Sequence, residues 1–285
     1  VDDRGQCVDL ADPTLQLCQR LCVDQIDLVD HHSIGERQLL HRLVLDTLGL
    51  HLVEVDEQML GIDDGDVYAV SDGLTGGVPH PGDFYSFVPI CVEGEIVAWA
   101  VGINHLMENG APVAGSWATF AVDTFMDGLV CPPMRTGRNL KQESWWRAIW
   151  ERRTRAATMN ILDDKMRLAG CAMVHAATHA LIEEFGLDYY KRAIREVIEE
   201  SRRMVVDNMR DTMVPGTYTG CAFRLVKYKG LQHVWSHADK NTLIHVRASV
   251  EPNENGLMFD TEGSSKWGYH SYNATPGGAD CAVFL

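Results

Sequence analysis

Three residues with metal-ligating side chains lie close together in the sequence. His80 and Asp83 are three positions apart, and His105 follows a run of β-type residues. Imidazole and carboxylate groups suit borderline or hard divalent ions such as Mn²⁺, Fe²⁺ and Zn²⁺. Two histidines and one carboxylate would leave coordination positions open for water or substrate, as a catalytic metal requires. The alternative is that His80 and Asp83 are turn residues and His105 is a buried, hydrogen-bonded imidazole.

A β-hairpin is expected to bring these three side chains together. Phe84–Ile90 is predicted to be one strand, Glu93-Gly94 a tight turn, and Ile96–Val101 the start of the returning strand. A hairpin places the beginning of its first strand beside the end of its second. The two ligands that precede the hairpin are therefore predicted to lie near the one that follows it.

A glycine-rich loop precedes the candidate ligands. Val67–Val70 is predicted to be a buried strand that leads into the loop Gly73–Gly77, where glycine permits close backbone approach. The loop has neither the Lys-Ser/Thr of a phosphate-binding loop nor a Gly-x-Gly-x-x-Gly pattern. Ser116 stands among small residues without an identifiable base, and no Gly-x-Ser-x-Gly sequence occurs. The chain therefore predicts no nucleotide site and no serine nucleophile of its own.

A second set of candidate ligands follows helical spacing. Cys171, His175 and His179 recur at i, i+4 steps, which places them on one helix face. Such a set could bind Zn²⁺, but no glutamate follows His175 as in the His-Glu-x-x-His motif. Leu168 and Ala176 share the face, as on a helix packed against neighbours. Packing is the favoured interpretation, and zinc binding is the alternative.

The elements that must position these residues indicate an α+β protein. We expect a mixed, barrel-like β-sheet core, an αα-hairpin and a C-terminal antiparallel β meander. The predicted division, as parts of one compact unit, is an N-terminal helical segment (1–62), a metal-binding β region with long loops (63–156), the αα-hairpin (157–214) and the meander (215–285).

Apolar spacing defines the αα-hairpin and the meander. The first helix is predicted from about Thr158 to Phe185, and the second is predicted to bury an apolar face. That face consists of Ile194, Val197, Ile198, Met204 and Val205. The meander strands are expected at Thr217–Val226, Leu231–Ser236, Leu243–Val250 and Leu257–Thr261. Residues 107–136 show little periodicity and are predicted to be long functional loops.

Composition excludes several classes of partner. The net charge is −15, from 25 Lys+Arg against 40 Asp+Glu, whereas nucleic acids and anionic membranes need a basic surface. No apolar run approaches the ~20 residues of a membrane span. The eight cysteines include no Cys-x-x-Cys pair, which is typical of reduced thiols. Since the N-terminal residues lack signal-peptide character, a cytoplasmic protein is expected.

Several short motifs occur in one order between Val67 and about Gly263. They are Ser71-Asp-Gly-Leu-Thr-Gly-Gly77, His80-Pro-Gly-Asp83, His105 with Glu108, Ala114-Gly-Ser116, Asp123 with Asp127-Gly-Leu-Val-Cys-Pro-Pro133, Pro215-Gly-Thr-Tyr218 and Thr261-Glu-Gly-Ser-Ser265. In these motifs and their order the chain resembles the hydantoinase B/oxoprolinase family. The chain departs from that family in having Ser71 for an asparagine, one residue inserted before His80, and no long glycine-rich C-terminal half. It therefore resembles a short or split version.

The resemblance implies site residues and an activity. His80, Asp83 and His105 would bind a divalent metal, with manganese preferred and zinc or iron as alternatives. Glu108 would orient a ligand or act as a base, and Asp123 is a second catalytic candidate. The implied activity is that of a subunit of an ATP-dependent ketone carboxylase of the acetone/acetophenone type, in which the metal assists carboxylation of an enolate.

The same resemblance implies partners and alternatives. A larger, hydantoinase A-like subunit would bind ATP, a small accessory subunit would complete the complex, and a ketone and bicarbonate would be the substrates. One alternative is a subunit of an ATP-dependent cyclic-amide hydrolase of the hydantoinase/oxoprolinase type. The other is a non-catalytic assembly subunit of such a complex.

Overall fold

The chain divides into two compact units, Val1–Thr47 and Leu48–Leu285, and the described residues all belong to the second. A computed structural model describes residues 61–121, 123–227, 241–253, 256–268, 270, 272–274 and 278–279. The predicted N-terminal helical segment (1–62) lies almost entirely outside these residues, and the expected strand Leu231–Ser236 lies wholly outside them.

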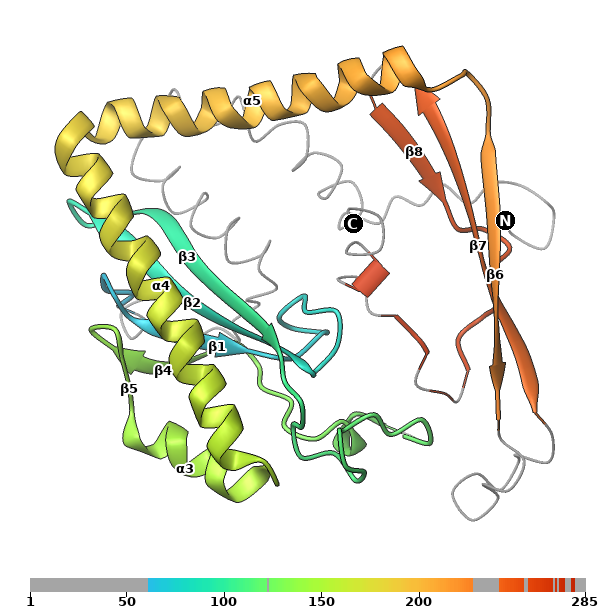
Figure 1. The fold of residues 1–285 in the computed structure, drawn as a ribbon, viewed down its shortest axis with the longest axis horizontal. Helices are drawn as coiled ribbons and strands as arrows, with labels where there is room; N and C mark the ends of the chain where they lie inside the picture. The colour runs from blue at the N-terminus through green and yellow to red at the C-terminus, as the bar shows by residue number, and fades with distance from the viewer. Residues whose placement is uncertain are drawn as a thin grey trace. The chain divides into compact units, whose positions relative to one another are not determined.

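A five-stranded antiparallel sheet carries the candidate metal ligands (Figure 1). Its strands are β1 (Val67–Val70), β2 (Asp83–Val92), β3 (Glu95–His105), β4 (Met134–Arg138) and β5 (Lys141–Gln142). Their spatial order is β3-β2-β1-β4-β5, and each neighbouring pair is antiparallel. The sheet is open and is not closed into a barrel, because β3 and β5 are its two edges. Helices and antiparallel strands together confirm the α+β class.

The β2–β3 hairpin forms as predicted, with its turn at Glu93-Gly94. Both turn residues have positive φ angles, 55° and 80°, which is the geometry of the tight turns that match strand twist. The register pairs Asp83 with His105 at the open end of the hairpin. The two strands thus bring the predicted ligands to one place.

Helix α4 (Ala157–Phe185) covers the β2–β3 face of this sheet (Figure 1). Two apolar clusters lie beneath the helices, one around Val88, Ala100 and Leu168 and the other around Phe84 and Trp150. The second cluster includes residues of helix α3 (Ser144–Arg153). Helix α3 and strands β4 and β5 were not predicted from the sequence. Core packing therefore extends over both halves of the sheet.

Arg167 of α4 is the polar link between helix and sheet. Its guanidinium donates to Asp164 Oδ1 at 2.8 Å, to Ser86 Oγ at 3.2 Å and to Asn104 Oδ1. Arg167 and Asp164 are 5% and 4% exposed. Burial lowers the pKa of Arg167 and raises that of Asp164, and their mutual attraction opposes both changes. Since Asn104 precedes His105, this buried pair also holds the strand end that carries a candidate ligand.

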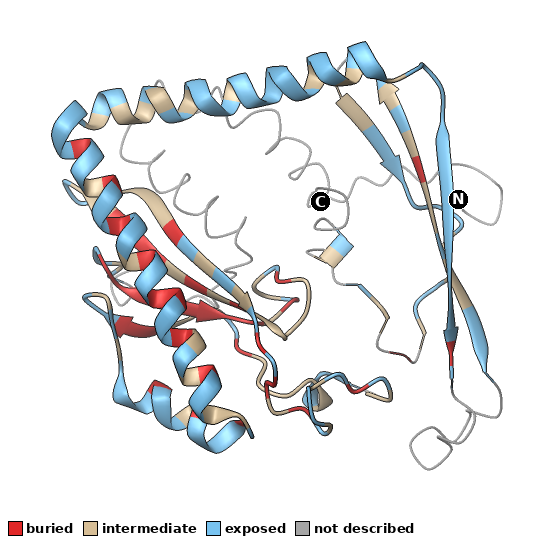
Figure 2. Ribbon diagram, viewed as in Figure 1, coloured by how far each residue is buried: buried red, intermediate tan, exposed pale blue. Residues whose placement is uncertain are grey.

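Helix α5 (Leu187–Thr212) contradicts one prediction. The expected buried face is exposed: Val197, Ile198 and Met204 are 63%, 56% and 62% exposed. None of the described side chains of α5 is buried (Figure 2). The amphipathic pattern correctly indicated a helix, but within the described residues no element covers its apolar face. Helix α5 follows α4 directly, with only Gly186 between them, as the sequence predicted for two consecutive helices.

A separate three-stranded antiparallel sheet forms the predicted meander. Its strands are β6 (Tyr218–Val226), β7 (Thr242–Asn253) and β8 (Gly256–Asp260), in that spatial order. Most of its side chains are exposed or half-buried. Among the residues that the structure describes, no helix has the length and apolar character needed to cross a bilayer.

Candidate metal centre

His80, Asp83 and His105 meet at the open end of the β2–β3 hairpin. One ligand atom from each lies within 4.8 Å of the others. His80 Nε2 lies 3.4 Å from Asp83 Oδ2, and the two imidazole centroids are 4.9 Å apart. Ligand atoms around a tetrahedral ion with bonds of 2.0–2.1 Å are separated by about 3.3 Å. The donor set and its spacing therefore fit a divalent metal ion.

Gly82 permits this close approach of the two imidazoles. A β-carbon at this position would lie 2.6 Å from His80 Cε1, 2.8 Å from His80 Nδ1 and 3.1 Å from His105 Nε2. The Gly82 N–H donates to His80 Nδ1 at 3.1 Å, and the Gly82 carbonyl accepts from the Leu106 N–H at 2.8 Å. Gly82 thus joins the loop that carries His80 to the strand end that carries His105.

The glycine-rich loop before His80 is held by its own residues. The Asp72 carboxylate accepts from the Leu74 N–H at 2.9 Å and from the Thr75 hydroxyl at 2.7 Å. The Gly76 N–H donates to the Asp72 carbonyl at 2.8 Å. These contacts close the loop on itself, as in a packing loop that presents the residues after it.

His80 has a lowered pKa. Burial is the largest cause, and the adjacent His105 acts in the same direction, whereas the Asp83 carboxylate opposes both. A neutral imidazole has a lone pair available for a metal ion, and a protonated one does not. His80 is therefore in the ligand-competent state near neutral pH.

Glu108 is buried and organises the loop after β3. It is 5% exposed, and its carboxylate accepts from Arg155 Nη1 at 2.5 Å, from the Arg155 N–H at 2.7 Å and from the Gly110 N–H at 2.7 Å. The Ser116 hydroxyl donates to the same group at 3.2 Å. Burial raises the pKa of Glu108, but these donors outweigh burial and the pKa is lowered. The ionised carboxylate is thus engaged with the loop and with Arg155.

Asp123 and Asp127 flank a short 3₁₀ helix, η1 (Thr124–Met126), beside the candidate ligands. Asp123 is exposed and caps this helix by accepting from the Phe125 N–H at 3.0 Å. Burial, and secondarily the charge of Asp123, raises the pKa of Asp127. Both aspartates line a cavity of about 520 Å³ that also borders His80 and His105. Sequence reasoning named Asp123 as a catalytic candidate but recorded Asp127 only as part of a motif.

Asn109 is a site residue that the sequence did not reveal. It is 3% exposed and donates through Nδ2 to the Pro81 carbonyl at 3.2 Å and to the Asp127 carbonyl at 2.8 Å. Its Oδ1 has no hydrogen-bond partner within the described part of the chain, and the residue lines the cavity. An unpaired buried oxygen is costly, so its presence at the cavity wall is consistent with a binding role.

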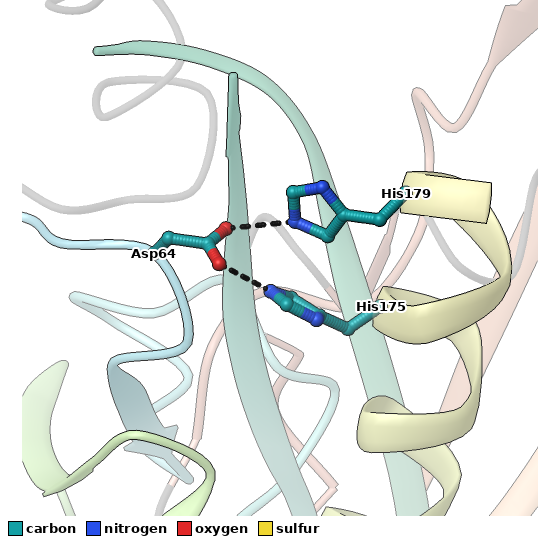
Figure 3. A group of neighbouring side chains, drawn as sticks. All are labelled: Asp64, His175 and His179. Atoms are coloured by element: carbon teal, nitrogen blue, oxygen red, sulfur yellow. Dashed lines mark hydrogen bonds and ion pairs between the residues drawn. The ribbon is translucent and has the colours of Figure 1, made fainter. Parts of the chain in front are cut away.

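The second predicted set of ligands is only partly assembled. Cys171 is 1% exposed and packs in the core, with Sγ 3.6 Å from the Ser86 carbonyl. This agrees with the packing interpretation for Cys171. His175 and His179 instead face Asp64, in the turn before β1 (Figure 3). Sequence spacing carries no signal for this pairing, because Asp64 lies 111 and 115 positions before His175 and His179.

Comparisons with known proteins agree on one family. The hydantoinase B/oxoprolinase family model matches residues 41–285. The alpha subunit of acetone carboxylase from Xanthobacter autotrophicus is 32% identical over 217 residues, covering 75% of this chain and 28% of that subunit. The delta subunit of acetophenone carboxylase from Aromatoleum aromaticum is 32% identical over 154 residues, covering 53% and 22%. The beta subunit of a caprolactamase from Pseudomonas jessenii is 26% identical over 162 residues, covering 56% and 27%.

Solved structures show the same relationship. The nucleotide-free structure of acetone carboxylase superposes with a TM-score of 0.72 at 29% identity, covering 80% of this chain and 30% of that one. An ATP-dependent caprolactamase from Pseudomonas jessenii shares the fold with a TM-score of 0.69 at 22% identity, covering 87% and 39%. The chain thus spans about a quarter of the length of the carboxylase subunits it matches, 28% and 22%.

Proposed function

Because the chain belongs to the hydantoinase B/oxoprolinase family, we propose that it is a subunit of an ATP-dependent ketone carboxylase of the acetone or acetophenone type. The observation that carries the proposal is the convergence of His80, Asp83 and His105 beside a cavity. The choice of carboxylase is supported by 32% identity over 217 residues to the acetone carboxylase subunit, against 26% over 162 residues to the caprolactamase subunit.

The three ligands would hold a divalent ion, preferably Mn²⁺. When bound, such an ion supplies Lewis-acid chemistry that stabilises negative charge on a ketone oxygen as an enolate develops. His80 and His105 would contribute nitrogen donors, and Asp83 would contribute a carboxylate oxygen. Coordination through His80 Nε2 requires the ring proton on Nδ1, so the hydrogen bond from the Gly82 N–H would open when metal binds.

Glu108 is proposed to act as a positioning residue. Its lowered pKa makes it a weak base near neutral pH, and its oxygens are occupied by Arg155, Gly110 and Ser116. Its role is to hold the loop whose next residue is Asn109, which contacts the His80-bearing loop through Pro81.

Asp127 is the better candidate for proton transfer. Forming an enolate removes a proton from the carbon beside the ketone carbonyl, and a base works best when its pKa lies nearer the working pH. The pKa of Asp127 is raised, and the residue lines the cavity beside the ligands. Asp123, which adds to this rise, is proposed as its electrostatic neighbour.

Partners are proposed to supply what this chain lacks. The glycine-rich loop closes on itself and lacks a phosphate-loop pattern, so ATP would bind to a larger hydantoinase A-like subunit. A small accessory subunit would complete the assembly. The ketone and bicarbonate would enter at the cavity beside His80.

The test is bicarbonate-dependent ATP hydrolysis with a ketone, measured on the purified complex that contains this chain. Asp83→Asn is expected to lower this activity by about 100-fold or more, since electrostatic stabilisation at the reacting centre is lost. The matched control is Asp63→Asn, which alters an exposed aspartate outside the cluster. Absence of ketone-stimulated ATP hydrolysis with every ketone tried would exclude the carboxylase.

A cyclic-amide hydrolase is the second candidate, supported by the similarity to the caprolactamase beta subunit. It predicts ATP hydrolysis that depends on a lactam or cyclic imide and does not require bicarbonate. A non-catalytic assembly role makes a third prediction: Asp83→Asn would leave the activity of the reconstituted complex intact. The same assays therefore separate all three.

A further inference from the structure

Asp64, His175 and His179 form a second cluster at the other end of the β2–β3 hairpin (Figure 3). His175 Nε2 lies 3.0 Å from Asp64 Oδ2, and His179 Nε2 lies 3.1 Å from Asp64 Oδ1. The two rings have centroids 4.5 Å apart. All three ligand atoms fall within 4.8 Å of one another. Both imidazoles thus aim a nitrogen at the same carboxylate.

Helix α4 positions the two histidines of the cluster, and a hydrogen bond from β2 positions its aspartate. His175 and His179 lie one turn apart on α4, a rigid scaffold on which i and i+4 side chains share a face. Asp64 Oδ1 accepts from the Cys91 N–H at 2.7 Å, which ties the carboxylate to the end of β2. The other oxygen, Oδ2, faces His175 Nε2. A hydrogen bond to a ligating carboxylate, such as the one from the Cys91 N–H, commonly orients a metal ligand.

We propose that Asp64, His175 and His179 form a second divalent metal site, suited to Zn²⁺. The separation of 3.0 Å between His175 Nε2 and Asp64 Oδ2 is close to the edge of about 3.3 Å of a zinc tetrahedron, and one ligand atom from each of the three residues lies within 4.8 Å of the others. Two imidazoles and a carboxylate are common zinc ligands, and the fourth position would take water. The ion would replace the two direct hydrogen bonds between the histidines and Asp64.

This second site is distinct in place and role from the candidate metal centre. Asp64 accepts a hydrogen bond from Cys91, near the end of β2, whereas Asp83 is the first residue of β2. The eight residues between these two positions of the strand correspond to about 27 Å. The site joins the turn before β1 to the C-terminal half of α4. Its role is structural: it fastens the helix that covers the hairpin to the start of the sheet.

The test measures Zn²⁺ in the full chain after equilibration with Zn²⁺ and removal of free metal. His80→Ala/His105→Ala, which disables the first cluster, is expected to retain one equivalent of zinc per chain. Adding Asp64→Asn is expected to remove that equivalent, whereas adding the matched control Asp63→Asn is expected to preserve it. Zinc content that is the same with Asp64→Asn and Asp63→Asn would overturn the proposal.

A second measurement guards against loss of folding in the variants. Co²⁺ added to the His80→Ala/His105→Ala chain should give the visible absorption of a four-coordinate, imidazole-bound ion, and excess Zn²⁺ should abolish it. The melting temperature should rise with Zn²⁺ in this chain and not in its Asp64→Asn derivative. No visible absorption in a folded chain that retains Asp64, His175 and His179 would mean that these residues form only a hydrogen-bonded triad.

Discussion

At the scale of single residues, the candidate metal centre depends on how closely two imidazoles and a carboxylate can approach. The hairpin register places Asp83 beside His105, and Gly82 leaves the space that both rings occupy. Burial keeps His80 neutral, so the ligand is available without loss of a proton. Each of these features can be changed by one substitution.

Gly82→Ala is predicted to weaken metal binding without unfolding the chain. The new methyl group would lie 2.6 Å from His80 Cε1 and 3.1 Å from His105 Nε2, so one or both rings must turn away. We expect about a tenfold or greater loss of Mn²⁺ affinity, comparable to the loss of a group that orients metal ligands. Isothermal titration with Mn²⁺ measures this change.

Gly220→Ala is the control for that substitution, because a β-carbon there meets nothing within 4 Å. Its Mn²⁺ affinity should equal that of the unmodified chain. Equal affinity in Gly82→Ala as well would contradict the role assigned to the close approach.

Glu108→Gln is predicted to destabilise the protein in a pH-dependent way. Burial raises the pKa of Glu108, but donors from Arg155, Gly110 and Ser116 lower it below the ordinary value of 4.5. A carboxylate with a lowered folded-state pKa stabilises above its unfolded pKa, and this contribution is lost as the pH falls through the folded value. At pH 7 the expected loss is about 2–3 kcal/mol, typical of hydrogen bonds to a charged group.

Urea unfolding of both proteins between pH 7 and pH 3 measures this difference. The gap in free energy of unfolding should be constant from pH 7 to about 5 and should shrink below the ordinary pKa of 4.5. A gap that does not change across this range would show that ionised Glu108 does not stabilise the loop.

Much of the site was predictable from sequence, but its surroundings were not. Residue type and spacing predicted that His80, Asp83 and His105 would converge, because a hairpin with a clear turn links positions that are near in sequence. Asn109 and Asp64 were missed because their roles depend on partners brought together by the fold. Nothing in the spacing of His175 and His179 points to an aspartate in the turn before β1.

At the scale of elements, α4 determines how the hairpin is held. Arg167 reaches Asp164 on its own helix, Ser86 on β2 and Asn104 on β3. Removing one partner of a buried pair leaves an uncompensated charge, whereas replacing both with apolar groups restores packing. The pair therefore makes a prediction about single and double variants.

Arg167→Met is predicted to lower the free energy of unfolding by about 3–5 kcal/mol, because buried Asp164 loses its partner. The double variant Asp164→Leu/Arg167→Met should recover part of this loss. Chemical denaturation of the three proteins provides the measurement. A double variant less stable than Arg167→Met alone would mean that the loss does not come from the unpaired carboxylate.

Substitutions on the exposed apolar face of helix α5 are expected to have little effect on stability, in contrast to those at the buried Arg167–Asp164 pair. Since Ile198 and Met204 are 56% and 62% exposed, replacing either with alanine should change the free energy of unfolding by less than about 0.5 kcal/mol. Trp150→Ala, at a position that is fully buried, should cost about 3–5 kcal/mol. A loss of more than about 1 kcal/mol in the α5 variants would mean that this face is covered in the isolated chain.

The elements that sequence reasoning missed carry weak local signals. Met134–Arg138 and Lys141–Gln142 are too short to show alternation, and β4 exists because it pairs with β1. Helix α3 begins after Glu143, which makes no side-chain capping bond, so no start signal marked it. The apolar face of α5 was predicted to be buried because amphipathic spacing reveals the face but not what covers it.

At the scale of the whole molecule, the two clusters lie at opposite ends of one hairpin. The first opens onto a cavity lined by Asn109 and Asp127, as a site that receives substrate would. The second joins α4 to the turn before β1, as a structural fastening would. This arrangement separates the proposed catalytic and structural metals by the length of β2.

The metal content of the purified complex that contains this chain, measured beside its His80→Ala/His105→Ala variant, tests the candidate metal centre most directly. The variant is expected to lose one equivalent of divalent metal per chain together with ketone-dependent ATP hydrolysis. Equal metal content in the two complexes would contradict the assignment of this site, because His80, Asp83 and His105 would then hold no ion.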